Sequence, residues 1–162
     1  MPVVPTYQSP LPLPLLSEVL AADVPKAFRS LVWVQEGDTY FVEFPAVRAD
    51  GTVDSYLTKW TFTFYPAQPP HVTFVNPTTK KYDGSSWPEA KNERVTLHPK
   101  YGDAPEGLIC NSMFYDWYYY GGHSNRPDVG WKPGVHKAIA TVVELRDLLR
   151  QPYYVGPRRA SS

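Results

Sequence analysis

Cysteine is almost absent from this chain, because Cys110 is the only one among 162 residues. A lone cysteine cannot form a disulfide within the chain, so no part of the sequence calls for an oxidising compartment. Long hydrophobic runs are also missing, since no stretch approaches the roughly 18 uncharged apolar residues needed to cross a bilayer. The apolar run from Leu11 to Leu20 is broken by prolines and by Glu18, which is not typical of a secretory signal. These absences predict a cytoplasmic protein with no membrane partner.

Net charge is missing as well, since 16 lysines and arginines balance 16 aspartates and glutamates. Nucleic-acid-binding domains carry an excess of positive charge, so we do not expect nucleic acid as a partner. Proline and aromatic residues are abundant instead, with 18 prolines, 12 tyrosines, 7 phenylalanines and 5 tryptophans. Because proline breaks helices, few long helices are expected. The length of the chain suits a single domain with one core.

The distribution of proline indicates how the chain is organised. Residues 1–14 contain five prolines, a composition that favours extended geometry over packing, and we expect a flexible arm there. A single domain is expected over residues 15–157, followed by a tail over residues 158–162. No internal repeat interrupts this organisation.

The first half of the domain predicts one helix and a sheet. A short helix is expected between residues 15 and 28, with Leu16 and Leu20 on one face. Four later segments are rich in β-branched and aromatic residues and are bounded by turn-forming residues. They are residues 31–34, 39–44, 56–64 and 71–75. Because no helical pattern separates them, we predict a four-stranded antiparallel meander.

The second half predicts a loop and one long helix. Residues 76–107 have weak periodicity and many turn formers, which is typical of irregular structure. Over residues 135–150 apolar side chains recur at spacings of three and four, with Pro133 before and Pro152 after the segment. This pattern predicts an amphipathic helix that packs on the sheet. The expected fold class is therefore α/β, of the α+β kind.

Three sequence segments carry a family resemblance, and they follow one another in a fixed order around Cys110. The segments are residues 65–74 (YPAQPPHVTF), His98-Pro99-Lys100 with residues 107–110 (GLIC), and Trp131-Lys132-Pro133. They resemble the Tyr-Pro-x-x-Pro-Pro-x-Val-x-Phe, His-Pro-Asn, Gly-x-Ile-Cys and Trp-x-Pro segments of ubiquitin-conjugating enzymes. The resemblance covers residues 15–152 and fits the predicted order of helix, meander, loop and helix.

The resemblance implies a fold and an activity. The fold is UBC-like: an N-terminal helix, a four-stranded antiparallel meander, an active-site loop and a C-terminal helix packed on the sheet. Cys110 is expected to accept a ubiquitin-like modifier as a thioester from an activating enzyme and to pass it to an amine of a protein substrate. No cofactor or metal is implied. Bacterial relatives of this kind work in operons linked to antiviral defence, and we expect a similar setting here.

The resemblance also assigns roles to residues away from the cysteine. Three are expected to brace the active-site loop: His98, Pro99 and Trp131. Five are expected to contact partner proteins: Leu16 and Leu20 on the first helix, and Pro66, Pro69 and Pro70 in the proline-rich loop.

The sequence departs from the family at the position of the His-Pro-Asn asparagine, where it has Lys100. In the family this asparagine is associated with oxyanion stabilisation or with loop order. Lys100 or Asn111, which follows Cys110, could stabilise an oxyanion electrostatically. The alternative for Lys100 is a solvated loop residue.

A second departure is an insertion. The spacing from His98 to Cys110 is two residues longer than is common in the family, and about a dozen extra residues precede Trp131. The inserted segment, residues 115–126, contains Asp116 and His123, whereas the acidic residues that follow the C-terminal helix in the family are absent. We expect Asp116 to help deprotonate the incoming amine and His123 to serve as an acid or base. The alternative is a surface loop anchored by its aromatic side chains.

Cys110 also admits interpretations other than thioester transfer. A lone cysteine is often a small buried hydrophobic residue. A cysteine hydrolase would pair Cys110 with His123 or His136, but residues 105–110 do not predict the helix N-terminus on which such nucleophiles usually lie. The histidines lack paired metal-ligand spacing. The main rival is a catalytically silent UBC-like module that binds a ubiquitin-like protein.

Overall fold

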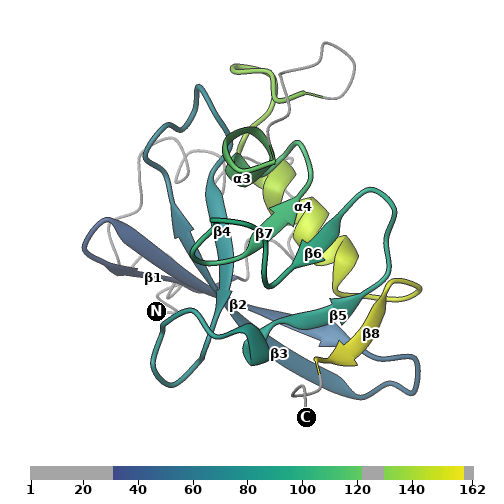
Figure 1. Cartoon of the computed structure of the whole chain (residues 1–162). Helices are drawn as coiled ribbons and strands as arrows, with labels where there is room; N and C mark the ends of the chain where they lie inside the picture. The colour runs from purple at the N-terminus through teal and green to yellow at the C-terminus, as the bar shows by residue number, and fades with distance from the viewer. Residues whose placement is uncertain (1–30, 122–129, 159–162) are drawn as a thin grey trace, which may run out of the picture.

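The computed structural model describes residues 31–121 and 130–158. Its main sheet is an antiparallel meander of four strands in chain order (Figure 1). The strands are β1 (Trp33–Glu36), β2 (Thr39–Val47), β3 (Val53–Thr61) and β4 (His71–Val75). The predicted four-stranded meander is therefore confirmed. The expected arm, the first helix with Leu16 and Leu20, and His123 lie outside the described residues.

Alternation of side chains explains the register of the sheet. In β3, Tyr56, Thr58 and Trp60 are buried while the residues between them are partly exposed. Tyr40 and Phe44 of β2 pair with Trp60 and Tyr56 respectively, which places the apolar side chains of both strands on one face.

The third strand lies three residues earlier than predicted, because it begins at Val53 and ends at Thr61 and not at Phe64. Backbone turns follow it: the amide of Tyr65 donates to the carbonyl of Phe62, and that of Gln68 to the carbonyl of Phe64. These hydrogen bonds occupy the carbonyl groups of Phe62 and Phe64, which are then not free to extend the β-ladder to Phe64. Phe62 nevertheless stays against the core, stacked on Trp60.

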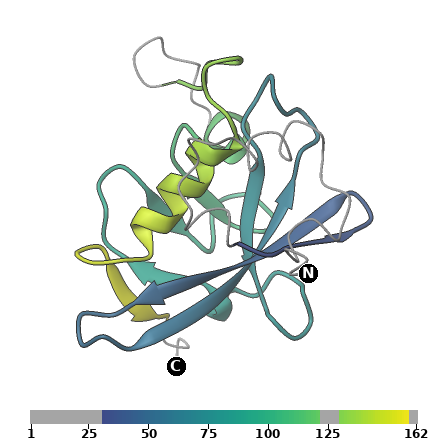
Figure 2. The same cartoon turned by 180° about the vertical axis from the view of Figure 1, so that it is seen from behind.

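The long helix, α4 (Ala138–Leu148), packs into the same core as the sheet (Figure 2). Its buried residues are Ala138, Thr141, Val142, Leu145 and Leu148. It begins later than the predicted residue 135, because the amides of Val135 and His136 bond to the carbonyl of Lys132 in a turn. Within the described residues, no helix has the length and apolar character to cross a bilayer.

The segment predicted to be an irregular loop contains short regular elements. They are the 3-10 turn η2 (Gly84–Ser86), β5 (Pro88–Ala90) and β6 (Thr96–His98). β5 pairs with β8 (Tyr154–Pro157), and β6 pairs with β7 (Leu108–Cys110). A further short helix, α3 (Tyr115–Tyr119), follows β7. Strands of three residues show too few alternations to be predicted from a period of two.

A polar network ties the C-terminal strand to the main sheet. Tyr154 donates to Asp54 Oδ2 at 2.7 Å, and Arg48 Nε donates to the same oxygen at 2.6 Å. The hydroxyls of Tyr56 and Tyr154 lie 2.5 Å apart. The hydrogen bond from Arg48 holds the pKa of Asp54 below its ordinary value.

Candidate active site

Cys110 is the last residue of β7 in the β6–β7 hairpin. It pairs with Thr96 across the hairpin, and Ile109 pairs with Leu97. Ile109 is fully buried and Leu108 is 1% exposed, whereas Cys110 is partly exposed and not in a disulfide. The hairpin is therefore anchored by its apolar residues, and successive residues of a strand point to opposite faces, so Cys110 points away from Ile109.

The loop that closes this hairpin is fixed to the main sheet. Lys59 Nζ lies 2.5 Å from Glu106 Oε1, and Thr73 Oγ1 donates to the carbonyl of Glu106 at 2.7 Å. Gly107 follows with a φ of 74°, in the left-handed region that glycine tolerates best. A Cβ at this position would lie 2.6 Å from the Trp87 ring. The strand leading to Cys110 therefore starts from a tightly packed point.

Asn111 shapes the turn that follows the cysteine. Its Oδ1 accepts from the amide of Met113 at 2.9 Å, and its Nδ2 donates to the carbonyl of Arg94 at 3.0 Å. Thr141 of α4 donates to the carbonyl of Met113 at 2.7 Å. Asn111 is one of the two residues considered for oxyanion stabilisation. One of the two hydrogens on its Nδ2 is already engaged in the hydrogen bond to Arg94.

Trp131 joins two of the recognised sequence segments. Its indole Nε1 donates to the carbonyl of Pro66 at 2.9 Å. Its backbone amide donates to the Tyr118 hydroxyl at 2.6 Å, and that hydroxyl donates to the carbonyl of Ser112 at 2.9 Å. Trp131 thus connects the proline-rich loop to the turn after Cys110. Tyr65 of the same loop accepts from the amide of Ala138 and so fixes the start of α4.

His98, Pro99 and Lys100 lie at the other end of the hairpin. His98 Nε2 is 3.1 Å from Thr96 Oγ1, and the Tyr82 hydroxyl donates to the carbonyl of Pro99. Lys100 is exposed. In the hairpin, Cys110 pairs with Thr96, whereas His98 pairs with Leu108 at the other end of the ladder. Lys100 follows His98, so its backbone lies more than about 7 Å from Cys110 in the strand direction. The register gives no support to Lys100 as an oxyanion stabiliser.

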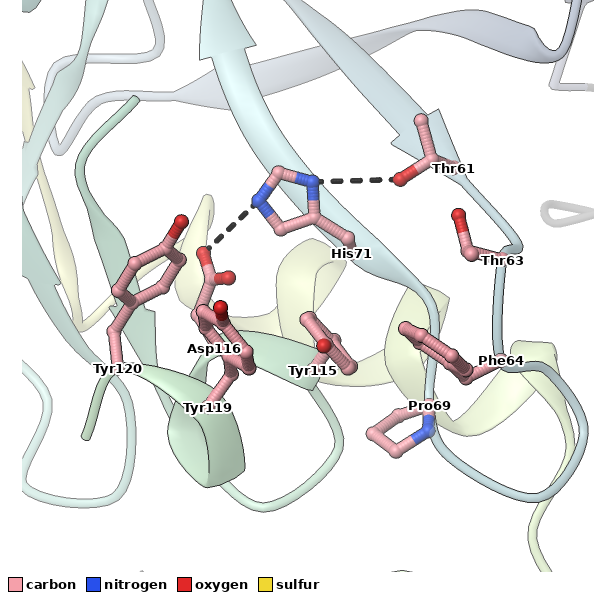
Figure 3. A pocket seen from close by; sticks show the side chains of 9 residues that line it. All are labelled: Thr61, Thr63, Phe64, Pro69, His71, Tyr115, Asp116, Tyr119 and Tyr120. Carbon is pink, nitrogen blue, oxygen red and sulfur yellow. Dashed lines mark hydrogen bonds and ion pairs between the residues drawn. The ribbon is translucent and has the colours of Figure 1, made fainter. Parts of the chain in front are cut away.

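Asp116 does not lie where the sequence analysis expects an acid for the incoming amine. It is 1% exposed, and its Oδ2 lies 3.2 Å from Nε2 of His71 (Figure 3). The pocket that it lines includes residues of β3, β4 and α3 but not Cys110. The correction follows from the packing of α3, which turns Asp116 toward β4.

The proline-rich loop also differs from expectation. Pro66 is exposed, but Pro69 and Pro70 are buried, so the latter two do not offer an open surface to a partner. The carbonyl of Pro70 accepts from the amide of Tyr115 at 3.1 Å, at the first residue of α3. The start of α3 therefore packs against this loop.

A groove beside the cysteine turn contains residues that the sequence analysis did not select. It has a volume of about 570 Å³ and is lined by Asn111, Met113 and Trp117 on one side and by Val143 and Glu144 of α4 on the other. Burial raises the pKa of Glu144, and the nearby Arg94 guanidinium partly offsets this. Glu144 shares a helix face with Ala140, which also lines the groove, but this spacing does not single out a functional carboxyl group in the sequence.

Among residues 31–121 and 130–158, no group of three histidine, cysteine or acidic side chains is arranged to hold a metal ion. No protein-family model, curated protein or solved structure matches the chain.

Proposed function

We propose that this chain is a UBC-like conjugating enzyme, in which Cys110 carries a ubiquitin-like modifier as a thioester and delivers it to an amine of a protein substrate. The observation that carries the proposal is the meeting of the three recognised segments at one place. Trp131 bonds to Pro66, and through Tyr118 it reaches Ser112, two residues after the cysteine. His98 and Cys110 occupy the two strands of one hairpin.

The arrangement of elements supports the same proposal. A four-stranded antiparallel meander comes first, the cysteine hairpin follows, and a helix then packs against the core. This is the order that the resemblance implies for the UBC-like fold. The inserted segment forms α3 and leaves this order unchanged.

The transfer chemistry needs two displacements at Cys110. Its thiolate attacks the carbonyl carbon of the thioester on the activating enzyme, forms a new thioester and releases the thiol of that enzyme. The substrate amine then attacks the Cys110 thioester, so that an amide bond forms, the C–S bond breaks and the cysteine thiol is regenerated. The proton lost by the amine passes to a base or to water. A cysteine at the end of an anchored strand suits this sequence because its position is fixed while two large partners exchange.

The partners of this reaction are a ubiquitin-like modifier, its activating enzyme and a protein substrate. Pro66 is exposed, as are Ala67 and Gln68 beside it, so this part of the proline-rich loop remains open to them. The role expected for the first helix concerns residues that are not described.

A silent UBC-like module is the second candidate, and one observation favours it. Two of the expected catalytic neighbours are engaged elsewhere, since Asp116 pairs with His71 and Asn111 holds the turn. Such a module would bind the modifier without forming a bond to it.

The experiment that separates the two uses the full chain, the activating enzyme and the modifier encoded beside its gene, and ATP. We expect a thiol-sensitive adduct on the wild type, seen by non-reducing electrophoresis and by mass spectrometry. Cys110→Ala removes it, Cys110→Ser gives a thiol-resistant ester or nothing, and the neighbouring variant Ser112→Ala keeps it. Absence of the adduct while the activating enzyme is charged overturns the carrier role and favours the silent module, and conjugation by Cys110→Ala also overturns it.

A further inference from the structure

A pocket of about 340 Å³ lies between the ends of β3 and β4 and the helix α3, and all of its lining residues are labelled in Figure 3. Cys110 is not among them, so this pocket is separate from the proposed transfer site. One wall comes from residues 115–120, which belong to the insertion that the family resemblance does not explain.

The floor of the pocket holds a buried carboxyl group with an unused oxygen. The side chain of Asp116 is 2% exposed, and burying a carboxylate is costly unless several donors surround it. Among the described residues, Oδ1 accepts no hydrogen bond, and Oδ2 has only His71 Nε2 at 3.2 Å. A carboxylate can accept about four hydrogen bonds. Asp116 therefore lacks donors.

His71 links Asp116 to β3. Its Nδ1 lies 3.4 Å from the hydroxyl of Thr61, and its Nε2 faces Asp116 Oδ2. A ring nitrogen carries at most one hydrogen, so His71 can supply a donor to Oδ2 but none to Oδ1. The open oxygen of this carboxyl group is therefore Oδ1.

Aromatic rings form the other wall. Phe64 stacks on Tyr115 with ring centroids 5.6 Å apart, and Tyr115 stacks on Tyr119 at 5.5 Å. Phe64 is 55% exposed and Tyr119 is 64% exposed. Exposed aromatic rings beside a carboxylate attract cations, because ring faces carry negative potential.

Further negative charge lies next to the pocket. An adjoining hollow shares Tyr119 and Tyr120 with it and is also lined by Asp103. Burial raises the pKa of Tyr120, and the charges of Asp116, Glu106 and Asp103 raise it further. Glu106 is paired with Lys59, so Asp103 and the open Oδ1 of Asp116 are the acidic groups at this pocket that have no lysine or arginine partner among the described residues.

We propose that this pocket binds the cationic side chain, an ammonium or guanidinium group on an aliphatic stem, of a basic segment in a protein partner. The stem lies along the rings of Phe64 and Tyr119, and the head group donates to Asp116 Oδ1. Because Asp116 is 1% exposed, the side chains that line the pocket beside it must shift to admit the head group.

The test is an NMR titration of the full chain with small probes. The cationic probes are the Nα-acetyl methylamides of arginine and lysine, and the matched neutral and anionic probes are those of norleucine and glutamate. We expect saturable backbone amide shifts, confined to the start of β4 and to α3, with the cationic probes alone. Shifts of equal size with norleucine, a preference for glutamate, or no shift with any probe would each overturn the proposal.

Variants locate the binding site. Asp116→Asn should weaken binding of the cationic probes by at least about tenfold, because a charge-assisted bond is lost. Tyr119→Leu, at an exposed position that leaves folding intact, should weaken it several-fold, and Glu89→Gln on β5 is the control that leaves it unchanged. Unchanged binding in Tyr119→Leu overturns the proposal even where Asp116→Asn does not fold. Cys110→Ser should bind the probes as the wild type does, so this result is independent of the transfer activity.

Discussion

Gly107 occupies a position that a side chain cannot share. It has a φ of 74°, and an added Cβ would lie 2.6 Å from the Trp87 ring and 2.8 Å from the carbonyl oxygen of His98. We predict that Gly107→Ala lowers the free energy of unfolding by about 2–4 kcal/mol, from backbone strain together with overpacking. Urea unfolding measures the loss.

Gly134 offers a matched control for this prediction. Its φ is 83°, but nothing lies within 4 Å of an added Cβ. Gly134→Ala therefore carries only the backbone strain, about 1 kcal/mol. Equal losses in the two variants would show that the contact with Trp87 does not matter.

Single residues of the site show which parts of it a sequence can reveal. The motif picks out Cys110 in the sequence, but it does not predict that this residue ends a strand, because β7 has only three residues and shows too little alternation. The neighbours of Asp116 do not follow from the sequence, because they depend on how α3 packs against β4, and nothing local encodes that contact. The position of Lys100 was not predictable either, because its separation from Cys110 depends on the register of the hairpin.

A helix or strand was predictable from the sequence where its pattern of apolar residues repeats along its own length. β4 coincides with the predicted residues 71–75, and α4 lies within the predicted residues 135–150, because each shows its period over its own length. β5 and β8 are short and far apart in the sequence, so neither shows a period and their pairing depends on the tertiary fold. The boundaries of α4 depend on the Tyr65 hydroxyl, a contact from another segment.

The helix α4 is coupled to the cysteine turn by one buried side chain. Thr141 is fully buried, and its hydroxyl donates to the carbonyl of Met113 at 2.7 Å. We predict that Thr141→Val lowers the free energy of unfolding by about 1–2 kcal/mol, because the carbonyl is left without its donor. Hydrogen exchange of the Phe114 amide, which bonds to the carbonyl of Asn111, should become faster.

Thr141→Ser keeps the hydroxyl and serves as the control. It should preserve slow exchange at Phe114 even where it loses some packing. If the serine and valine variants exchange equally fast at this amide, the hydrogen bond is not what holds the turn.

The whole molecule responds to acid through the network that ties β8 to the sheet. The folded state lowers the pKa of Asp54, chiefly through the hydrogen bond from Arg48. The ionised carboxylate therefore stabilises the fold above its ordinary pKa of 3.8, and this contribution is lost as pH falls through the lower folded-state value. We predict that Asp54→Asn is less stable than the wild type near neutral pH and that the difference shrinks in strong acid.

Urea unfolding at several pH values measures this difference, and Asp38→Asn, at an exposed position, is the control. A difference for Asp54→Asn that stays constant from neutral pH to strong acid would contradict the assignment.

The pairing of β5 with β8 has a consequence for synthesis of the chain. Strands β1 to β4 are consecutive, so each can pair soon after it leaves the ribosome. β5 must wait while residues 91–153 are made, which takes several seconds at about 5–20 residues per second. During that interval its open edge and the neighbouring Trp87, fully buried in the finished fold, are exposed to other nascent chains. β5 and Trp87 are therefore the segment of the nascent chain that a chaperone would need to shield.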